Sequence, residues 1–187
     1  MKAKQAILPG LIFSILSLTF ATNWIASPHL FWTSNTSMDQ TEEMSSPVNS
    51  TSLSLAFPSS IQAWKDLILN SALQYDLDPD LIAAVMLQES GGNASAYSAS
   101  GAVGLMQVMP RDGLADRFIC GDNPCFRSRP SIEELSDPQF NIDYGSRMLA
   151  GLFGKYGDWR EALRAYGPMD VGYDYADIVL NIYENYG

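Results

Sequence analysis

Residues 78–92 read Asp-Pro-Asp-Leu-Ile-Ala-Ala-Val-Met-Leu-Gln-Glu-Ser-Gly-Gly. The Asp78-Pro79 pair is typical of a helix start, because an Asp side chain caps free N–H groups and Pro fits the first helical position. The Gly91-Gly92 pair is typical of a helix end. The apolar residues between the two pairs predict a buried helix that begins at Pro79 and ends near Glu89.

Glu89 places a carboxyl group in the last turn of this helix, on its apolar side. It follows Val85 by four residues and Ile82 by seven, so it continues their stripe. Burial disfavours the charged carboxylate, as does the partial negative charge at a helix C-terminus, and both effects raise the pKa. A carboxyl group with a raised pKa can donate a proton near neutral pH. The alternative is an exposed Glu in a fraying turn, since Glu is seldom buried.

Four more segments show helical periodicity, and none shows the sustained alternation of a β-strand. The predicted helices are 60–75, 138–156, 159–166 and 175–186. Long loops at 91–104 and 109–137 lie between helices, and long loops in a small domain usually shape a binding site. We therefore expect an all-α domain with little or no β-sheet.

The first 58 residues differ in composition from the rest of the chain. Residues 1–26 begin with lysines and continue as an apolar run, like an export signal, and Thr19-Phe20-Ala21 offers a cleavage site. A membrane anchor is the alternative, because no further charge occurs before Asp39. Residues 27–58, rich in Ser and Thr, predict a disordered linker. The folded domain is expected at 59–187, in an exported protein of the extracellular space, cell-wall space or periplasm.

The charge of the chain argues against one class of partner. Its formal net charge is -10, from 11 Lys and Arg against 21 Asp and Glu. Nucleic-acid phosphates are bound mainly by Lys and Arg, so we expect no nucleic-acid partner. We also expect no cofactor, and a monomer.

The only two cysteines, Cys120 and Cys125, enclose the turn residues Gly-Asp-Asn-Pro. In an exported protein this spacing predicts a disulfide that fixes a loop. A metal site is the alternative, but two Cys and the single His29 cannot supply the four ligands of a structural zinc ion. We therefore predict no metal.

Three blocks of the sequence resemble one known family. They are Glu89-Ser90 with Ser98 and then Gly-Ala-x-Gly-Leu-Met-Gln-x-Met-Pro at 101–110, Asn141-Ile142 with Gly145 and Leu149, and Ala-Leu-x-Ala-Tyr at 162–166. These blocks resemble the signature of the soluble lytic transglycosylase (SLT) domain family, over about residues 61–186. The resemblance implies a lysozyme-like fold and an enzyme that cleaves peptidoglycan glycan strands.

The resemblance also implies a mechanism with one carboxyl group. Glu89 would protonate the glycosidic oxygen between N-acetylmuramic acid and N-acetylglucosamine. The Glu89 carboxylate would then accept the proton of the muramoyl 6-hydroxyl as that oxygen attacks the anomeric carbon, which gives a 1,6-anhydro product. Most glycosidases need two carboxyl groups. The segment 90–111 contains no Asp or Glu, which suits the mechanism with one.

Other residues match family positions beside the acid. Ser98 and Tyr166 match positions that orient the substrate, and Gln107 and Met109 match positions that line the sugar cleft. For Ser98 and Tyr166 the alternatives are an ordinary loop residue and core packing. Where the family has an Asn after the Ala-Tyr pair, this chain has Gly167, so no role is carried over to that position.

Two other functions remain open at this stage. A lysozyme-type or chitinase-type hydrolase would need a second carboxylate or a positioned water opposite Glu89. The candidate carboxylates are Asp112, Asp116, Glu133 and Asp170, and Asp112 or Asp170 close to Glu89 would favour a hydrolase. A noncatalytic module that binds the cell wall would not need Glu89 at all. Membrane attachment through the N-terminus is open as well.

Overall fold

Seven α-helices, one 3-10 helix and one two-stranded hairpin make up residues 52–168 and 170–187, the parts of the chain that the computed structural model describes. In chain order they are α1 (Ser59–Gln62), α2 (Lys65–Tyr75), α3 (Pro79–Ser90), the 3-10 helix Gly113–Arg117, β1 (Ile119–Cys120), β2 (Asn123–Pro124), α4 (Ile132–Leu135), α5 (Pro138–Tyr156), α6 (Trp159–Tyr166) and α7 (Asp174–Tyr186). The expected all-α fold with little β-sheet is confirmed.

The two Asp-Pro pairs start helices as predicted. The Asp78 carboxylate accepts a hydrogen bond from the Asp80 amide at the start of α3, 2.9 Å, and Asp137 accepts one from the Phe140 amide at the start of α5, 2.8 Å. Both helices end at glycines in the left-handed region, where a side chain would strain the backbone. Short-range capping chemistry therefore sets the bounds of α3 and α5.

The predicted helix 60–75 is interrupted in the structure. The chain turns at Ala63 and Trp64, between α1 and α2. The Trp64 indole N–H donates to the carbonyl of Gly92, 3.0 Å, just beyond the end of α3. Local periodicity predicted one continuous helix because it carries no information on this contact between distant segments.

Residues 52–58, which the composition assigned to the linker, pack onto the domain. Leu53 and Phe57 are only 2% and 3% exposed, and the Phe57 ring stacks on Tyr186 in α7. The Ser54 amide also donates to the Asp80 carboxylate, 2.8 Å. The packed region thus begins before residue 59, while the predicted signal or anchor at 1–26 and the rest of the linker lie outside the described residues.

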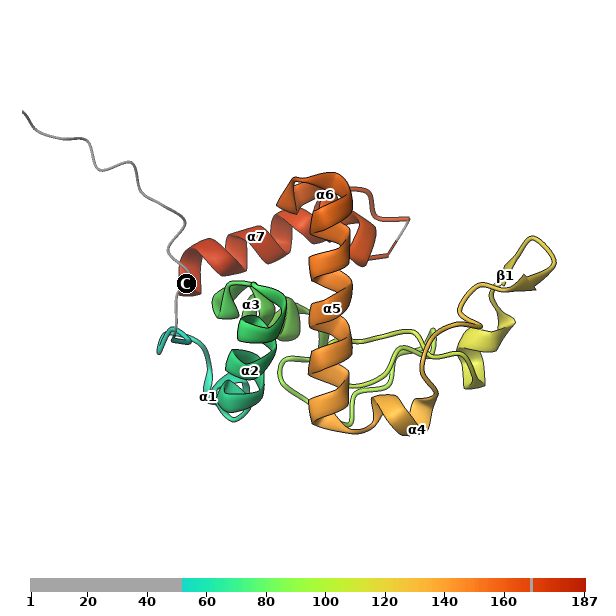
Figure 1. The fold of residues 1–187 in the computed structure, drawn as a ribbon, viewed down its shortest axis with the longest axis horizontal. Coiled ribbons are helices and arrows are strands. Elements are labelled where there is room, and N and C mark those ends of the chain that lie inside the picture. The colour runs from blue at the N-terminus through green and yellow to red at the C-terminus, as the bar shows by residue number, and fades with distance from the viewer. Residues whose placement is uncertain (1–51, 169) are drawn as a thin grey trace, which may run out of the picture. The chain divides into compact units, whose positions relative to one another are not determined.

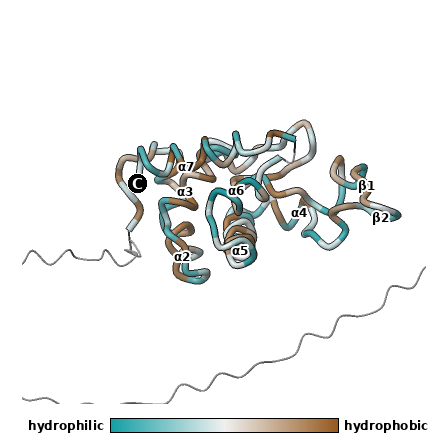
Figure 2. Tube along the Cα trace, turned by 90° about the horizontal axis from the view of Figure 1, so that it is seen from above, coloured by the Kyte–Doolittle hydropathy of each residue, from teal (hydrophilic) through white to brown (hydrophobic). Residues whose placement is uncertain are grey.

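Helix α5 runs through the middle of the domain (Figure 1). Helices α2 and α3 lie on one side of it, and the long segment from α3 to α4, which includes the hairpin, extends on the other side. Contacts join α2 and α6 to α5, and α7 to α3. The hydrophobic stretches of α2, α3 and α5 are visible in Figure 2. Within the described ranges, no helix has both the length and the hydrophobicity that a membrane crossing requires.

Candidate active site

Helix α3 is the most deeply buried element, and it holds Glu89 at its end. The six consecutive residues 81–86 are all buried, so this helix has no solvent-facing side over that stretch. Glu89 itself is half-buried in the last turn, two residues before Gly91 ends the helix. The helix therefore fixes the backbone of the acid inside the domain and leaves its carboxyl group partly accessible.

The surroundings of Glu89 favour the protonated acid. Burial of its carboxyl group raises the pKa of Glu89 to about 7, while a hydrogen bond from Tyr175 acts in the opposite direction. The Tyr175 hydroxyl donates to Oε1 of Glu89 at 2.6 Å. The raised pKa expected from the sequence is thus confirmed, with burial as its largest cause. A carboxyl group of this kind exchanges a proton near neutral pH.

Two tyrosines, the buried Tyr175 and the half-buried Tyr166, lie beside the acid. The rings of Tyr166 and Tyr175 stack with their centroids 6.5 Å apart. The Tyr166 hydroxyl donates to the Met106 carbonyl, 2.9 Å, so it connects α6 to the loop after α3. Burial and the charge of Glu89 raise the pKa of both tyrosines well above their usual value, so both remain hydrogen-bond donors at neutral pH.

Tyr175 is the site residue that the sequence did not reveal. The sequence predicted only that Tyr175 begins the last helix. Its hydrogen bond to Glu89 joins residues 86 positions apart, which local sequence patterns do not predict. Its ring lies against Gly167: a Cβ atom at that position would be 2.4 Å from the ring carbon Cγ of Tyr175. The glycine that departs from the family pattern is therefore the one that admits the Tyr175 ring.

The loop after α3 is held against the site by buried hydrogen bonds. The Asn141 side chain, fully buried on α5, accepts from the Met106 amide at 2.8 Å and donates to the carbonyls of Val103 and Leu135, both at 2.9 Å. Ser90, next to the acid, donates to the Leu105 carbonyl at 2.8 Å. The matching blocks of sequence, although far apart in the chain, thus meet in space.

Three of the four predicted substrate-binding residues lie on this loop, and two of these three form hydrogen bonds within it; the fourth, Tyr166, is on α6. The Ser98 hydroxyl accepts from the Ala102 amide, 2.9 Å. The Gln107 amide group donates to the carbonyls of Gly104, 3.0 Å, and Ala96, 3.3 Å. Met109 is half-buried at the end of the loop. A direct contact of these side chains with substrate stays a prediction.

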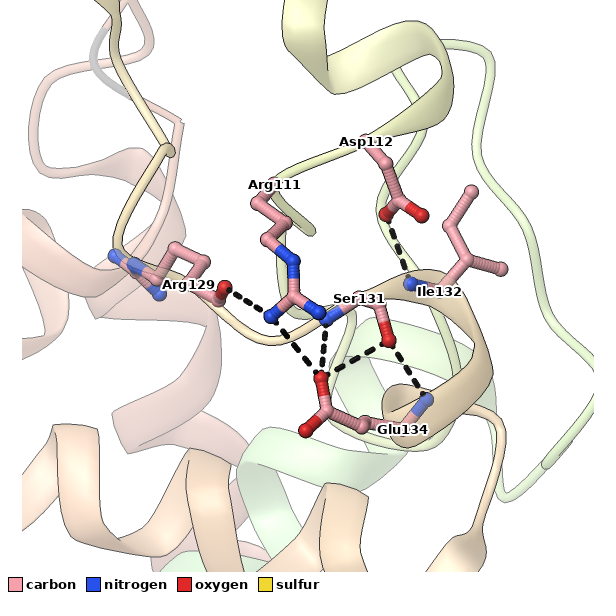
Figure 3. A network of polar contacts seen from close by, with 6 residues as sticks. All are labelled: Arg111, Asp112, Arg129, Ser131, Ile132 and Glu134. Atoms are coloured by element: carbon pink, nitrogen blue, oxygen red, sulfur yellow. Dashed lines mark hydrogen bonds and ion pairs between the residues drawn. The ribbon is translucent and has the colours of Figure 1, made fainter.

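The candidates for a second carboxylate are occupied elsewhere or exposed. The Asp112 carboxylate accepts from the Ile132 amide, 2.9 Å, and so caps α4 (Figure 3). Asp170 is exposed. Two carboxyl groups that share a site raise each other's pKa, yet no carboxylate in the part of the chain that the structure describes contributes to the pKa of Glu89. Among the described residues, the pKa of Glu89 is therefore set by burial and by Tyr175, without a neighbouring carboxylate.

The segment before α7 is fixed by a cluster of charged and aromatic side chains. Arg160 on α6 pairs with Asp177 on α7 and lies over the Tyr173 ring, 4.1 Å from its centroid. The Tyr173 hydroxyl donates to Glu161, which also pairs with Arg164. The cluster joins α6 to α7 two residues before Tyr175, so it restricts where that tyrosine can lie.

The disulfide prediction is confirmed. Cys120 and Cys125 are bonded across the hairpin of β1 and β2, with their Cα atoms 4.9 Å apart. Residues 52–168 and 170–187 contain no group of three or more His, Cys, Asp or Glu side chains placed to hold a metal ion.

A family model, described as the transglycosylase SLT domain, matches residues 66–171. This range is more than half of the chain, and it includes Glu89 and the two loops that follow α3.

Curated relatives carry related names. The membrane-bound lytic murein transglycosylase E of Buchnera aphidicola is 38% identical over 96 residues, which are 51% of this chain and 42% of that protein. The transglycosylase of Enterobacteria phage PRD1 is 35% identical over 103 residues, 55% of this chain and 34% of the phage protein. The match therefore spans less than half the length of these relatives.

One solved structure shows the same fold. It is an inactive mutant of the lytic transglycosylase Slt from Pseudomonas aeruginosa, with a TM-score of 0.52 and 24% identity over 70% of this chain and 24% of that one. The lysozyme-like fold that the resemblance implied is thus confirmed.

Replacing the acid by its neutral isostere is expected to stabilise the protein at high pH. A carboxyl with a pKa of about 7 when folded and 4.5 when unfolded destabilises the folded state as pH rises above 4.5, by up to about 3 kcal/mol above pH 7. Urea unfolding should therefore show Glu89→Gln more stable than wild type at pH 8, and nearly equal to it at pH 4.5. A gain of equal size at both values would contradict the raised pKa.

A methyl group at position 167 is expected to push Tyr175 out of place. Gly167→Ala should lower the free energy of unfolding by roughly 1–3 kcal/mol, the usual range for overpacking. The matched control is Gly151→Ala, which adds the same methyl group in α5 where no atom lies within 4 Å. The control should be stabilising by roughly 0.5–1 kcal/mol. Similar effects of the two substitutions would show that the Tyr175 contact does not matter.

Proposed function

This chain belongs to the transglycosylase SLT domain family, and we propose that it cleaves the β-1,4 bond between N-acetylmuramic acid and N-acetylglucosamine in peptidoglycan. The cleavage would consume no water, and Glu89 would be the only general acid and base. The observation that carries the proposal is the half-buried carboxyl group of Glu89, whose pKa is raised by burial to about 7 with no contribution from another carboxylate of the described residues. The product would be a glycan strand that ends in a 1,6-anhydro ring.

The first step needs a protonated carboxyl group. Glu89 donates its proton to the glycosidic oxygen as the bond from that oxygen to the anomeric carbon breaks. With a pKa of about 7, an appreciable fraction of the protein holds this proton at neutral pH, whereas an exposed Glu would hold almost none. Burial therefore supplies the acid that bond cleavage requires.

The second step returns the proton to Glu89. The muramoyl 6-hydroxyl oxygen attacks the anomeric carbon and its proton passes to the Glu89 carboxylate, so the enzyme is regenerated and no water is consumed. A hydrolase needs a second carboxylate to activate water or to attack the sugar. The absence of any carboxylate influence on Glu89 among the described residues supports the one-carboxylate route.

Neighbouring side chains would hold the acid and the sugar. Tyr175 donates to Glu89 and stabilises its anion between the two steps. Ser98, Gln107, Met109 and Tyr166 stay our candidates for contacts to the sugars. The loop that carries the first three is fixed to the domain by Asn141, so their positions are set before the substrate binds.

The proposed location follows from the substrate and the N-terminal sequence. Several relatives are named as membrane-bound. We propose that this protein is exported to the compartment that holds the cell wall, by a cleaved signal or a retained anchor at residues 1–26. Sequencing the N-terminus of the exported protein separates the two.

The reaction type is tested by the mass of the products. Digests of purified cell wall with wild-type protein should contain muropeptides that are one water lighter than hydrolytic products. Glu89→Gln, which keeps the shape of the side chain and loses its proton transfer, should reduce their yield at least about a thousandfold. Products with ordinary reducing ends would instead favour the hydrolase, and undiminished activity of Glu89→Gln would remove both enzymatic functions.

The pH profile tests the role of Tyr175. Because the hydrogen bond from Tyr175 lowers the pKa of Glu89, Tyr175→Phe should raise that pKa. The alkaline limb of kcat/KM, where the acid loses its proton, should then move to higher pH. Tyr183→Phe is the matched control, since it removes a similar tyrosine-carboxylate hydrogen bond to Asp78 at the other end of α3. A limb that stays fixed in Tyr175→Phe, or moves equally in both variants, would contradict this role.

A further inference from the structure

One cationic side chain near the site lacks an acidic partner. Acids outnumber Lys and Arg by 21 to 11 in this chain, yet among the described residues only three arginines form an ion pair with an acid. Arg111, Arg160 and Arg164 each pair with an acid. No carboxylate of residues 52–168 and 170–187 pairs with Arg129.

The backbone of Arg129 is fixed between the disulfide hairpin and α4. Its amide donates to the Phe126 carbonyl, 2.8 Å, and its carbonyl accepts from the Arg111 guanidinium, 3.3 Å. Figure 3 shows that the Arg129 side chain points away from the network formed by Arg111, Ser131 and Glu134. Glu134 therefore neutralises the charge of Arg111 and not that of Arg129, whose guanidinium points in another direction.

The guanidinium of Arg129 contacts groups that do not neutralise it. One of its nitrogens lies 2.7 Å from the Met148 sulfur, and it lies over the Phe126 ring, 5.9 Å from the centroid. A thioether is a weak acceptor. Arg129 is also half-buried, so water screens its charge less than on an open surface. The contacts orient the guanidinium and leave most of its donors without a strong acceptor.

Arg129 also lies within electrostatic reach of the acid's surroundings. Met148 is on α5 three residues after Gly145, so both face the same side of that helix. A Cβ atom at Gly145 would be 3.1 Å from the Tyr166 hydroxyl. The positive charge of Arg129 lowers the pKa of Tyr166, against the larger effect of burial. Since Tyr166 stacks on the tyrosine that binds Glu89, the cation lies at the edge of the same site.

We propose that Arg129 is a specificity-determining residue that binds a carboxylate of the muramoyl unit or of the peptide attached to it. The inference rests on the proposed function and deepens it. The sugar rings of peptidoglycan and their acetamido groups are uncharged, and the carboxylates are carried by the lactyl-peptide branch of muramic acid. A guanidinium at the edge of the site would therefore recognise that branch.

The chemistry of the contact favours a carboxylate over other groups. A guanidinium offers paired N–H donors whose spacing matches the two carboxylate oxygens. A carboxylate would replace the weak sulfur contact with charge-assisted hydrogen bonds. Because hydrogen bonds to Phe126 and Arg111 hold the Arg129 backbone, little ordering is needed on binding. An uncharged glycan such as chitin would gain none of this energy.

The test compares two substrates with one protein. Glycan strands with their peptides are used as isolated, and again after their carboxyl groups are converted to amides with a carbodiimide and excess ammonia. The quantity measured is the ratio of kcat/KM for the charged strands to kcat/KM for the amidated strands. Wild type should show a ratio of about ten or more, the effect of one charge-assisted hydrogen-bonded pair.

Two variants test whether Arg129 causes the preference for charged strands that this kcat/KM ratio measures. Arg129→Gln should bring the ratio close to one. Arg127→Gln, which removes the same charge from an exposed position in the same loop, should keep the wild-type ratio. An unchanged ratio in Arg129→Gln, or an equal fall in Arg127→Gln, would overturn the inference.

The outcomes separate this inference from the proposed function. If wild type gives anhydro ends from both substrates at equal rates, the inference about Arg129 fails and the function stands. If wild type gives no anhydro ends from either substrate, the function fails. Should Arg129→Gln not fold, the ratio measured on the wild-type protein alone still decides, because a ratio near one overturns the inference.

Discussion

The burial of one carboxyl group at the end of a buried helix is the constraint on which the rest of the site depends. Residues 81–86 of α3 have no exposed face, so the helix cannot turn Glu89 into solvent without moving the core. The ends of α3 are fixed by Asp78, whose carboxylate also accepts from Tyr183 on α7, and by Ser90, which binds the Leu105 carbonyl. The position of the acid is thus a property of the whole core.

The pKa of the acid follows from two opposing effects. Burial raises the pKa of Glu89, and the hydrogen bond from Tyr175 lowers it, with a result of about 7. Tyr175 can approach only because Gly167 has no side chain, and the cluster around Tyr173 holds the chain just before it. The residue at which this chain departs from the family pattern, Gly167, therefore makes room for Tyr175, which donates the hydrogen bond to Glu89.

The sequence was sufficient where the chemistry is local. Helix starts at Asp-Pro pairs, helix ends at glycine and the disulfide depend on neighbours in the chain, and the structure confirms them. The apolar stripe of its own helix was enough to predict the raised pKa of Glu89, although the burial that causes it involves the whole core. Tyr175, the packing of residues 52–58 and the unpaired charge of Arg129 depend on contacts between distant segments. Periodicity and capping patterns carry no information on such contacts. The family resemblance marked Asn141 without showing that it holds the loop.

The central claim is that Glu89 is a single acid whose pKa is set by burial. Carbon-13 NMR of the side-chain carboxyl groups, followed from pH 4 to 9, tests it on the resting protein without any substrate. We predict one carboxyl resonance, absent from Glu89→Gln, that titrates near 7 in a single step. A Glu89 resonance that titrates near 4.5, or in two steps coupled to a second carboxyl group, would contradict the account.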